Sequence, residues 1–328
     1  MKDICGKFDY KIVAIGGGTG LSTMLRGLKL FTDNITAVVT VADDGGGSGV
    51  LRHDLGILPP GDIRNCILAL ANTEPTMEQL LQYRFKEGML KGQNFGNLFL
   101  AAMVGISKNF EEAIKKMSEV LAVSGKVLPV SLDDLKLIAQ LEDGTIIKGE
   151  SQIPIVQQRL GIPVKKMYIE PENAVPFEEV ITDILNADAI VLGPGSLYTS
   201  IIPNLLVDGV ADAIERSKAL KIYVLNIMTQ PGETLGYSAV DHVCALFSHK
   251  LKSLDYIIVN SGIIPTTYVE RYVKDKSLPV EYDVKELTKI GIRTIEEDVV
   301  ALKKEYIRHD EKKLAKVIMN LIIENLKN

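Results

Sequence analysis

A glycine-rich turn near the start of the chain has the features of a phosphate-binding turn. Residues 11–28 read KIVAIGGGTGLSTMLRGL, in which a short apolar stretch ends at Ile15 and a helical pattern begins near Leu21. Backbone N–H groups at a helix start attract anions, and glycine lets a phosphate approach the backbone closely. We therefore assign anion binding to the five residues of the turn: Gly16, Gly17, Gly18, Thr19 and Gly20.

This turn matches neither of the common nucleotide motifs. A P-loop needs Gly-Lys-[Ser/Thr], which does not follow, and the dinucleotide fingerprint needs a third glycine where Leu21 stands. These mismatches weaken an ATP or nicotinamide interpretation. The competing structural interpretation is a tight turn that only packs the helix against the strand.

A second loop is too polar to lie in a core and has the composition of a functional loop. Residues 41–65 read VADDGGGSGVLRHDLGILPPGDIRN. Asp43 stands where an acidic residue of a Rossmann-type fold meets a ribose hydroxyl, and Asp44 beside it suits Mg²⁺ held against a diphosphate. Gly45 and Ser48 are assigned to the same site. The alternative is a turn-forming role, because Asp before Gly is common in turns.

Two helix starts carry further candidates. In PPGDIRN, Asp62 is the expected N-cap, and Arg64 and Asn65 lie in the first helical turn. A guanidinium is unfavourable there unless an anion or acid lies beside it, so Arg64 suits a phosphate or carboxylate. An ion pair with a loop aspartate explains Arg64 equally well. In GQNFGN, Asn94 and Asn97 suit sugar or base edges, although capping alone would explain one of them.

Two later strand–turn–helix patterns, IVLGPGSLYTS and YVLNIMTQPGETLG, bring hydroxyl and amide side chains to helix starts. Their candidate residues are Gly193, Gly195, Ser196, Thr199, Asn226, Thr229, Gln230, Glu233 and Thr234. Because the carboxyl ends of parallel strands meet at one edge, we expect the turns at 16–20, 43–48, 193–196 and 229–234 to line one crevice. That crevice predicts a nucleotide-like ligand.

No nucleophilic or zinc-binding set emerges from the sequence. The four histidines lack zinc spacing, and GPGSLYT lacks the glycine that a Gly-x-Ser-x-Gly elbow needs after serine. Hydrolase and metalloprotease functions are therefore not expected, and catalytic residues stay unassigned.

These turns need a sheet to position them. Short β-branched runs predict strands at 11–15, 35–41, 188–193, 221–227 and 256–260, and helical spacing predicts helices at 61–72, 76–85, 94–105, 238–249 and 310–326. The alternation predicts an α/β fold, a Rossmann-like parallel sheet flanked by helices. Residues 126–170 break this rhythm, and the Asp143-Gly144 pair indicates a hairpin, so we expect a small β-rich insertion there.

The composition narrows the expected partners and the cellular compartment. The net charge of −5 gives no reason to expect nucleic acid or an anionic membrane surface as a partner. Three widely spaced cysteines favour a reducing compartment. The first residues lack the apolar core of a signal peptide, and no run approaches the ~20 apolar residues that a membrane span needs. We expect a cytoplasmic protein without membrane insertion.

The motifs resemble those of the gluconeogenesis factor family, also called YvcK-like, within the CofD-like superfamily of 2-phospho-L-lactate transferases. The resemblance rests on AIGGGTGLSTMLRGLK, TVADDGGGSGVLR, LPPGDIRN, GNLFLAAM, GKVLPVSLDDLKLIAQLEDG, LGPGSLYTSIIPNLLV, NIMTQPGET and RHDEKKLAKVI. It implies a single CofD-like domain over residues 1–328, with the insertion at 126–170 inside it. It also implies binding of UDP-sugars, notably UDP-N-acetylglucosamine, and a need for the protein in cell morphogenesis during gluconeogenic growth.

The resemblance also assigns site residues. The diphosphate would lie among Gly17, Gly18, Thr19, Gly195 and Ser196, with Asp43 and Asp44 nearby as Mg²⁺ ligands. Tyr272 and Arg308 match family positions linked to UDP-sugar binding, where a ring suits uracil and a guanidinium suits diphosphate.

Two departures from the family pattern bear on catalysis. Gly47 replaces the first serine of the expected Asp-Asp-Gly-Gly-Ser-Ser loop, and Gln93 replaces the usual histidine before GNL. Losing an acid–base group favours binding over turnover. The leading hypothesis is a UDP-sugar-binding regulator that acts through a cell-wall synthesis protein, with homo-oligomers left open. The alternatives are a phospho-transferase that moves a phospholactyl group from a GDP conjugate to a deazaflavin, and an unrecognised nucleotide-sugar-converting enzyme.

Overall fold

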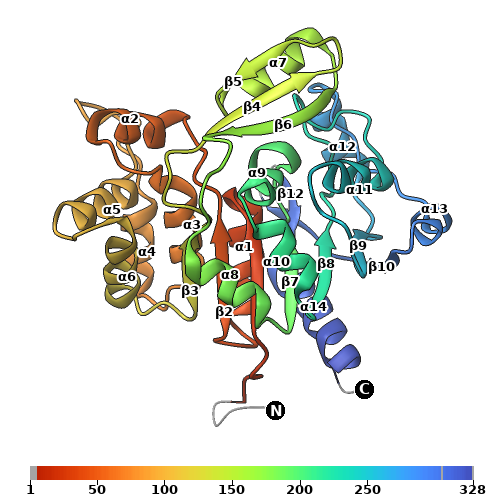
Figure 1. Cartoon of the computed structure of the whole chain (residues 1–328), viewed down its shortest axis with the longest axis horizontal. Helices are drawn as coiled ribbons and strands as arrows, with labels where there is room; N and C mark the ends of the chain where they lie inside the picture. Colours follow the sequence, from red (N-terminus) through yellow and green to blue (C-terminus); the bar gives the residue numbers. More distant parts are fainter. Residues whose placement is uncertain (1–5, 304–305, 327–328) are drawn as a thin grey trace.

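A seven-stranded parallel sheet forms the centre of the computed structural model, which describes residues 6–303 and 306–326. Its order is β10-β9-β8-β7-β1-β2-β3 (Figure 1). The strands are β1 Ile12–Gly16, β2 Ile35–Val39, β3 Lys126–Pro129, β7 Ala189–Leu192, β8 Leu220–Val224, β9 Tyr256–Asn260 and β10 Arg293–Glu297. The predicted α/β class with a parallel sheet is confirmed; β10 is a strand that the apolar runs did not reveal.

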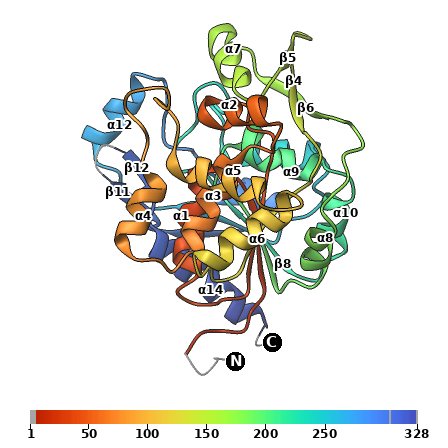
Figure 2. The ribbon, with the colours of Figure 1, turned by 90° about the vertical axis from the view of Figure 1, so that its left-hand side faces the viewer.

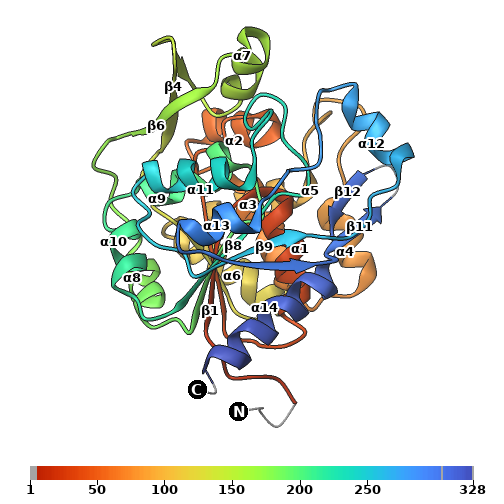
Figure 3. The same ribbon diagram turned by 90° about the vertical axis from the view of Figure 1, so that its right-hand side faces the viewer.

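Helices cover both faces of the sheet. The N-terminal half contains α1 Gly18–Leu28, α2 Gly46–Leu55, α3 Pro60–Leu70, α4 Pro75–Gln82, α5 Phe95–Gly105 and α6 Phe110–Val120. The C-terminal half contains α8 Glu178–Leu185, the π-helix η1 Leu197–Ile201, α9 Ile202–Leu206, α10 Val210–Arg216, α11 Ala239–Ser248, α12 Thr266–Val273, α13 Val284–Lys289 and α14 Glu311–Leu326. Views along the sheet place α1 and α14 on one side and α8 and α10 on the other (Figures 2 and 3).

The core explains why these segments form these elements. All five residues of β1 and of β2 are buried, as expected for strands covered on both faces. Helix α14 buries Leu314, Ile318 and Ile322 on one stripe and packs against α1. The sheet is therefore held between two apolar layers, and its strand ends are fixed relative to one another.

The β-rich insertion is shorter than predicted. Strands β4 Lys136–Leu141, β5 Ile146–Lys148 and β6 Val164–Glu170 form an antiparallel sheet that also carries α7 Gln152–Leu160. Asp143 closes the predicted turn by accepting a hydrogen bond from the N–H of Thr145 at 2.9 Å. The predicted start at residue 126 is wrong, because Lys126–Pro129 pairs in parallel with β2 as the edge strand of the large sheet. A proline is tolerated at such an edge.

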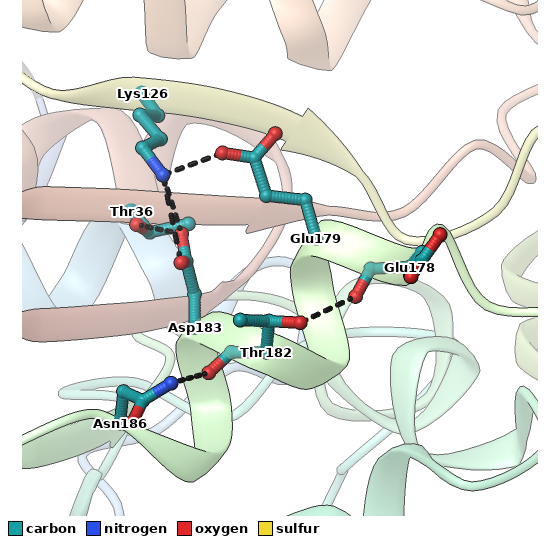
Figure 4. Close-up of polar contacts among 7 residues, drawn as sticks. All are labelled: Thr36, Lys126, Glu178, Glu179, Thr182, Asp183 and Asn186. Carbon is teal, nitrogen blue, oxygen red and sulfur yellow. Dashed lines mark hydrogen bonds and ion pairs between the residues drawn. The ribbon is translucent and has the colours of Figure 1, made fainter.

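Side-chain contacts hold this edge strand to the neighbouring helix α8. Lys126 forms ion pairs with Glu179 and Asp183, and Asp183 also accepts a hydrogen bond from Thr36 of β2 at 2.7 Å (Figure 4). The chain thus leaves the large sheet at residue 129 and enters the insertion from a fixed point.

A hairpin of β11 Val300–Lys303 and β12 Tyr306–His309 precedes α14. Within the described part of the chain, no single helix is long and apolar enough to cross a membrane. One bent pair, Leu197–Leu206 with Val210–Arg216, meets the length and composition criteria together.

Candidate functional site

A cavity of about 450 Å³ opens where three of the predicted turns meet. Its lining includes residues 17–20 before and within α1, residues 194–196 after β7, and residues 226–231 after β8. The hairpin strand β12 and α12 add Arg308 and Tyr272. The structure thus brings together residues that lie almost 300 positions apart in the sequence.

Close backbone contacts explain the glycines of the first turn. A Cβ atom on Gly20 would lie 2.4 Å from the carbonyl oxygen of Pro194, and one on Gly17 would lie 2.6 Å from Asp62 Oδ2. Helix α1 begins at Gly18, earlier than the predicted start near Leu21, and its N-cap residue Gly17 has no side chain to cap it. Its first N–H groups therefore have no partner within the helix. The turn after β7, at Pro194 and Gly195, packs directly against this helix start.

Side chains tie the turn after β7 (the second turn of the cavity) to the turn after β8 (its third turn). Ser196 Oγ donates to Gln230 Oε1 at 2.8 Å, and Asn226 Nδ2 donates to the carbonyl oxygen of Gly195 at 2.9 Å. Of the nine candidates from these turns, five line the cavity: Gly195, Ser196, Asn226, Thr229 and Gln230.

Glu233 supports the turns from below the cavity. It is 1% exposed and accepts hydrogen bonds from Thr199 Oγ1 at 2.9 Å, Gln230 Nε2 at 3.0 Å and the N–H of Tyr198 at 3.0 Å. Burial raises its pKa to about 7, although the hydrogen bonds from Thr199 and Tyr198 oppose that change. Thr234 likewise holds the turn, because its Oγ1 accepts from the N–H of Gln230 at 2.9 Å.

The opposite wall comes from the C-terminal part of the chain. Tyr272 accepts a hydrogen bond from the N–H of Ile307 at 3.0 Å, which fixes α12 against β12. The Arg308 guanidinium donates to the carbonyl oxygen of Ile307 at 2.9 Å and lies over the ring of Tyr306. His309 is buried beside it, and burial lowers its pKa to about 4. The imidazole is therefore neutral at pH 7, and Arg308 supplies the positive charge of this wall.

The carboxylate of Asp62 lies next to the first turn. Asp62 reaches beneath Gly17 and accepts the N–H of Gly18; burial, followed by the charge of Asp43, raises its pKa to about 6. Asp62 does not cap α3 as predicted: the N-cap is Pro59, and Asp62 lies in the first turn. Pro60 occupies the first helical position because its missing N–H costs nothing there.

The loop at 43–48 does not line the 450 Å³ cavity. Asp43 accepts the N–H of Gly45 at 2.9 Å, and Asp44 accepts the N–H of Ser151 at 2.8 Å. Asp44 instead lines a second cavity of about 790 Å³ with Arg52 and His53. The expected single crevice is thus formed by three turns, with the fourth behind Asp62. Among the described residues, no group of three or more His, Cys, Asp or Glu side chains is placed to hold a metal ion.

Glu150 is a candidate that the sequence patterns missed. It comes from the turn between β5 and α7, and burial followed by the charge of Asp43 raises its pKa to about 8. Its neighbour Ser151 contacts Asp44, and Pro154 packs against Gly232 of the third turn. The insertion therefore bridges two loops of the site, which no local pattern within 126–170 indicated.

The remaining candidates lie at the starts of α3 and α5. Asn94 caps this helix by accepting the N–H of Asn97 at 3.2 Å, as the capping alternative predicted. Arg64 makes no ion pair with a described aspartate; it donates to Asn65 Oδ1 at 2.6 Å. None of these four residues lines the 450 Å³ cavity.

A parallel α/β sheet with a polar, glycine-lined cavity at the carboxyl ends of β1, β7 and β8 is the arrangement in which open α/β folds place their ligand sites. Residues 12–300 match the family described as 2-phospho-L-lactate transferase CofD. The Gluconeogenesis factor of Bacillus subtilis strain 168 is 48% identical, covering 96% of this chain and 98% of that protein. A relative from Thermoanaerobacterium thermosulfurigenes, also named for gluconeogenesis, is 68% identical over 95% of this chain and 97% of its own length.

A solved structure agrees with these similarities. The crystal structure of a UPF0052 family member from Bacillus halodurans superposes with a TM-score of 0.90 at 46% identity, covering 95% of this chain and 100% of that one. The chain belongs to the CofD family, and its curated relatives are gluconeogenesis factors.

Proposed function

We propose that the chain binds a UDP-sugar, with UDP-N-acetylglucosamine as the leading ligand. The observation that supports this proposal most strongly is that one cavity is lined by three backbone turns, Tyr272 and Arg308. The first-turn N–H groups of α1 that follow Gly18, whose own N–H is accepted by Asp62, and the Ser196 hydroxyl suit diphosphate oxygens. Arg308 would neutralise part of the diphosphate charge, and the Tyr272 ring offers a surface for uracil.

Mg²⁺ fits this site only through the acidic loop. Asp43 is the better placed of the two predicted ligands, since its charge acts on Asp62 beside the first turn. Asp44 is held by Ser151 and borders the other cavity. Mg²⁺ held by Asp43 would offset part of the diphosphate charge.

Calorimetric titration tests the ligand directly. Wild-type protein should bind UDP-N-acetylglucosamine saturably, and mass spectrometry should recover the ligand unchanged. Arg308→Ala should weaken binding by about tenfold or more, because a charge-assisted contact is lost. Arg216→Ala is the matched control, since Arg216 is exposed in the last turn of α10 and does not line the cavity. Absence of binding, or equal effects of both variants, would contradict the proposal.

A phospho-transferase is the second candidate, and the family match supports it. Asp62 and Glu150, whose pKa values are raised to about 6 and about 8, have the proton affinity that a general base needs at neutral pH. Incubation with a GDP-conjugated phospholactate and a deazaflavin would yield a new phosphodiester if this candidate is right. Consumption of UDP-N-acetylglucosamine instead would indicate a nucleotide-sugar-converting enzyme.

The cellular role proposed is a cytoplasmic regulator of cell shape during gluconeogenic growth, acting through a cell-wall synthesis protein. The gluconeogenesis factor name of its relatives supports the growth condition. Expression in Bacillus subtilis lacking its own factor tests this role: normal rods should return on gluconeogenic carbon with wild-type protein but not with Arg308→Ala. Light scattering on the purified protein would show whether it is a homo-oligomer.

A further inference from the structure

The outermost strand of the large sheet, β10, leaves a row of backbone groups unpaired. Strand β10 ends the order β10-β9-β8-β7-β1-β2-β3 and pairs with β9 over its whole length, Arg293–Glu297, without a bulge (Figure 3). Its other side faces no strand of the described chain, and every residue of β10 is at least partly exposed. The free edge of a strand is a template on which another strand can pair.

The hydrogen bonds of β10 indicate which of its groups point outward. The N–H of Arg293 and the carbonyl oxygen of Glu297 bond to the residues that flank β9, at 3.1 and 3.0 Å. In a parallel ladder, successive residues direct their N–H and C=O groups to opposite sides. The N–H and C=O groups of Thr294 and Glu296 therefore point away from β9, and no hydrogen bond outside the sheet joins them to a described backbone group.

The opposite edge of the sheet is protected, whereas β10 is not. Strand β3 carries Pro129, which has no N–H to donate, and Lys126, whose ion pair with Glu179 ties the strand to α8. Strand β10 reads RTIEE, with neither proline nor lysine. Natural sheets shield a free edge by such devices, so an edge that lacks them is expected to have a partner.

We propose that β10 is the interface of a homodimer, in which it pairs antiparallel with β10 of a second copy around a two-fold axis at Ile295. Thr294 then lies opposite Glu296 of the second copy, and the two residues exchange both N–H···O=C bonds. The axis repeats this pair, so every outward group of these residues obtains a partner. Two seven-stranded sheets become one continuous sheet, and neither copy of this edge stays exposed.

The side chains of β10 identify a second copy as the partner, because the strand is complementary to itself in this register. Arg293 lies opposite Glu297 of the second copy, and the axis repeats this ion pair. The Arg293 guanidinium carbon lies 4.2 Å from the ring centroid of Tyr256, which holds Arg293 on the face that it shares with Glu297. Within one chain, Arg293 and Glu297 are about 13 Å apart along the strand and cannot pair. Centring the axis one residue later would place Glu296 opposite its own copy, with like charges facing.

Apolar side chains add to the interface. Ile295 is half-buried in the single chain and would face its own copy across the axis, at a pair where antiparallel strands approach closely. Helix α13 packs against β10 and exposes Val284 and Ile290, which are available for the second copy to cover. No residue of β10 lines the 450 Å³ cavity, so the interface does not depend on the proposed UDP-sugar binding.

Sedimentation velocity on the full chain tests the interface. Wild-type protein should be a dimer that dissociates on dilution. Thr294→Pro removes an outward N–H that has no partner in the single chain, so the variant should keep its circular dichroism spectrum and sediment as a monomer. Thr294→Ala keeps this N–H and should stay dimeric. A wild type that is monomeric at all concentrations, a larger assembly, or a dimer that survives Thr294→Pro overturns the proposal.

Exchanging the charges tests the register. Arg293→Glu or Glu297→Arg alone places like charges opposite each other twice in the dimer and should raise its dissociation constant by about tenfold. The double variant with both changes should recover most of the affinity, because each new pair forms between the copies. A double variant that dissociates as readily as the single variants contradicts the antiparallel pairing.

A cysteine at the axis gives a second readout. Ile295→Cys should form a disulfide-linked dimer on mild oxidation, since residues that face each other in a non-hydrogen-bonded pair lie within disulfide reach. Thr294→Cys is the matched control: it faces Glu296 rather than itself and should cross-link no more than wild type, which carries the same native cysteines. Equal cross-linking of the two variants would contradict an axis at Ile295. UDP-N-acetylglucosamine binding, measured separately, should be unchanged in Thr294→Pro.

Discussion

The Ser196 hydroxyl lies 2.8 Å from Gln230 Oε1, and this contact joins the turn after β7 to the turn after β8. Gln230 in turn donates to buried Glu233, which also holds the start of η1 through Tyr198 and Thr199. One buried carboxylate therefore sets the position of two of the three turns around the 450 Å³ cavity.

Glu233→Gln should weaken both the fold and ligand binding. The amide offers a donor where the carboxylate accepts, so one of its partners loses its acceptor, and unfolding should require about 1–3 kcal/mol less free energy. Affinity for UDP-N-acetylglucosamine should fall because Ser196 is no longer held. Urea denaturation and calorimetry measure the two effects.

Glu87→Gln is the control for this change, since Glu87 is exposed on a surface turn. If Glu233→Gln behaves like Glu87→Gln in both measurements, Glu233 does not organise the turns.

Gly20→Ala should disrupt the contact between the first two turns. The added methyl would lie 2.4 Å from the Pro194 carbonyl oxygen, so backbone must move, at a cost of about 1–3 kcal/mol. Gly105→Ala supplies the comparison, because a Cβ there meets no atom within 4 Å and Gly105 is helical. Differential scanning calorimetry should show a lower unfolding midpoint for Gly20→Ala and an unchanged midpoint for Gly105→Ala. Equal midpoints would refute the close approach of Gly20 to the Pro194 carbonyl oxygen.

Two variants of Tyr272 separate the role of its ring in stacking from the role of its hydroxyl in hydrogen bonding. Tyr272→Phe loses the hydroxyl that accepts from Ile307 but keeps the ring, so UDP-N-acetylglucosamine affinity should change little. Tyr272→Ala removes the ring and should weaken binding by about tenfold. Calorimetric titration of both variants decides the role: similar losses in the two would mean that the hydroxyl matters and the ring does not.

Acid should destabilise the protein through its buried histidines. His242 and His309 each have a pKa lowered to about 4 by burial, whereas the unfolded chain binds those protons near pH 6.5. At each histidine the unfolded state thus holds more protons between these values, so the stability that this group contributes is fully present above pH 6.5 and falls as the pH drops toward 4. The raised pKa values of Asp62, Glu150 and Glu233 act in the opposite direction over the same range. The loss should reach about 3 kcal/mol for each histidine.

His309→Gln tests this pH dependence. Glutamine retains a donor for the Leu225 carbonyl oxygen and does not titrate, so the slope of unfolding free energy against pH should fall relative to wild type by up to about 1.4 kcal/mol per pH unit between pH 6.5 and 4. His53→Gln is the matched control, as the His53 side chain is 91% exposed. An unchanged slope in His309→Gln would contradict the assignment.

Sequence patterns predicted the sheet well, because its strands are buried runs of β-branched residues whose pattern is local. They also placed the turns at strand ends, which the parallel topology then brought together at one edge. The insertion boundary was wrong, because Lys126–Pro129 pairs with β2 through contacts that span ninety positions and leave no local signal.

The acidic loop shows a second limit of the patterns. Residues 43–48 have the composition of a cavity wall, yet Arg52 holds this loop by donating to the Asp43 carbonyl oxygen and to Leu135 near the insertion. Glu150 reaches the site only through tertiary packing of the insertion. Which polar loops enter a cavity depends on such long-range contacts.

A crystal structure of the protein with UDP-N-acetylglucosamine tests the central claim most directly. The diphosphate should lie within hydrogen-bonding distance of the N–H groups at the start of α1 and of Ser196 Oγ, with Arg308 beside it. A ligand seated in the 790 Å³ cavity beside Asp44 and Arg52, or bound without contact to the glycine turn, would contradict it.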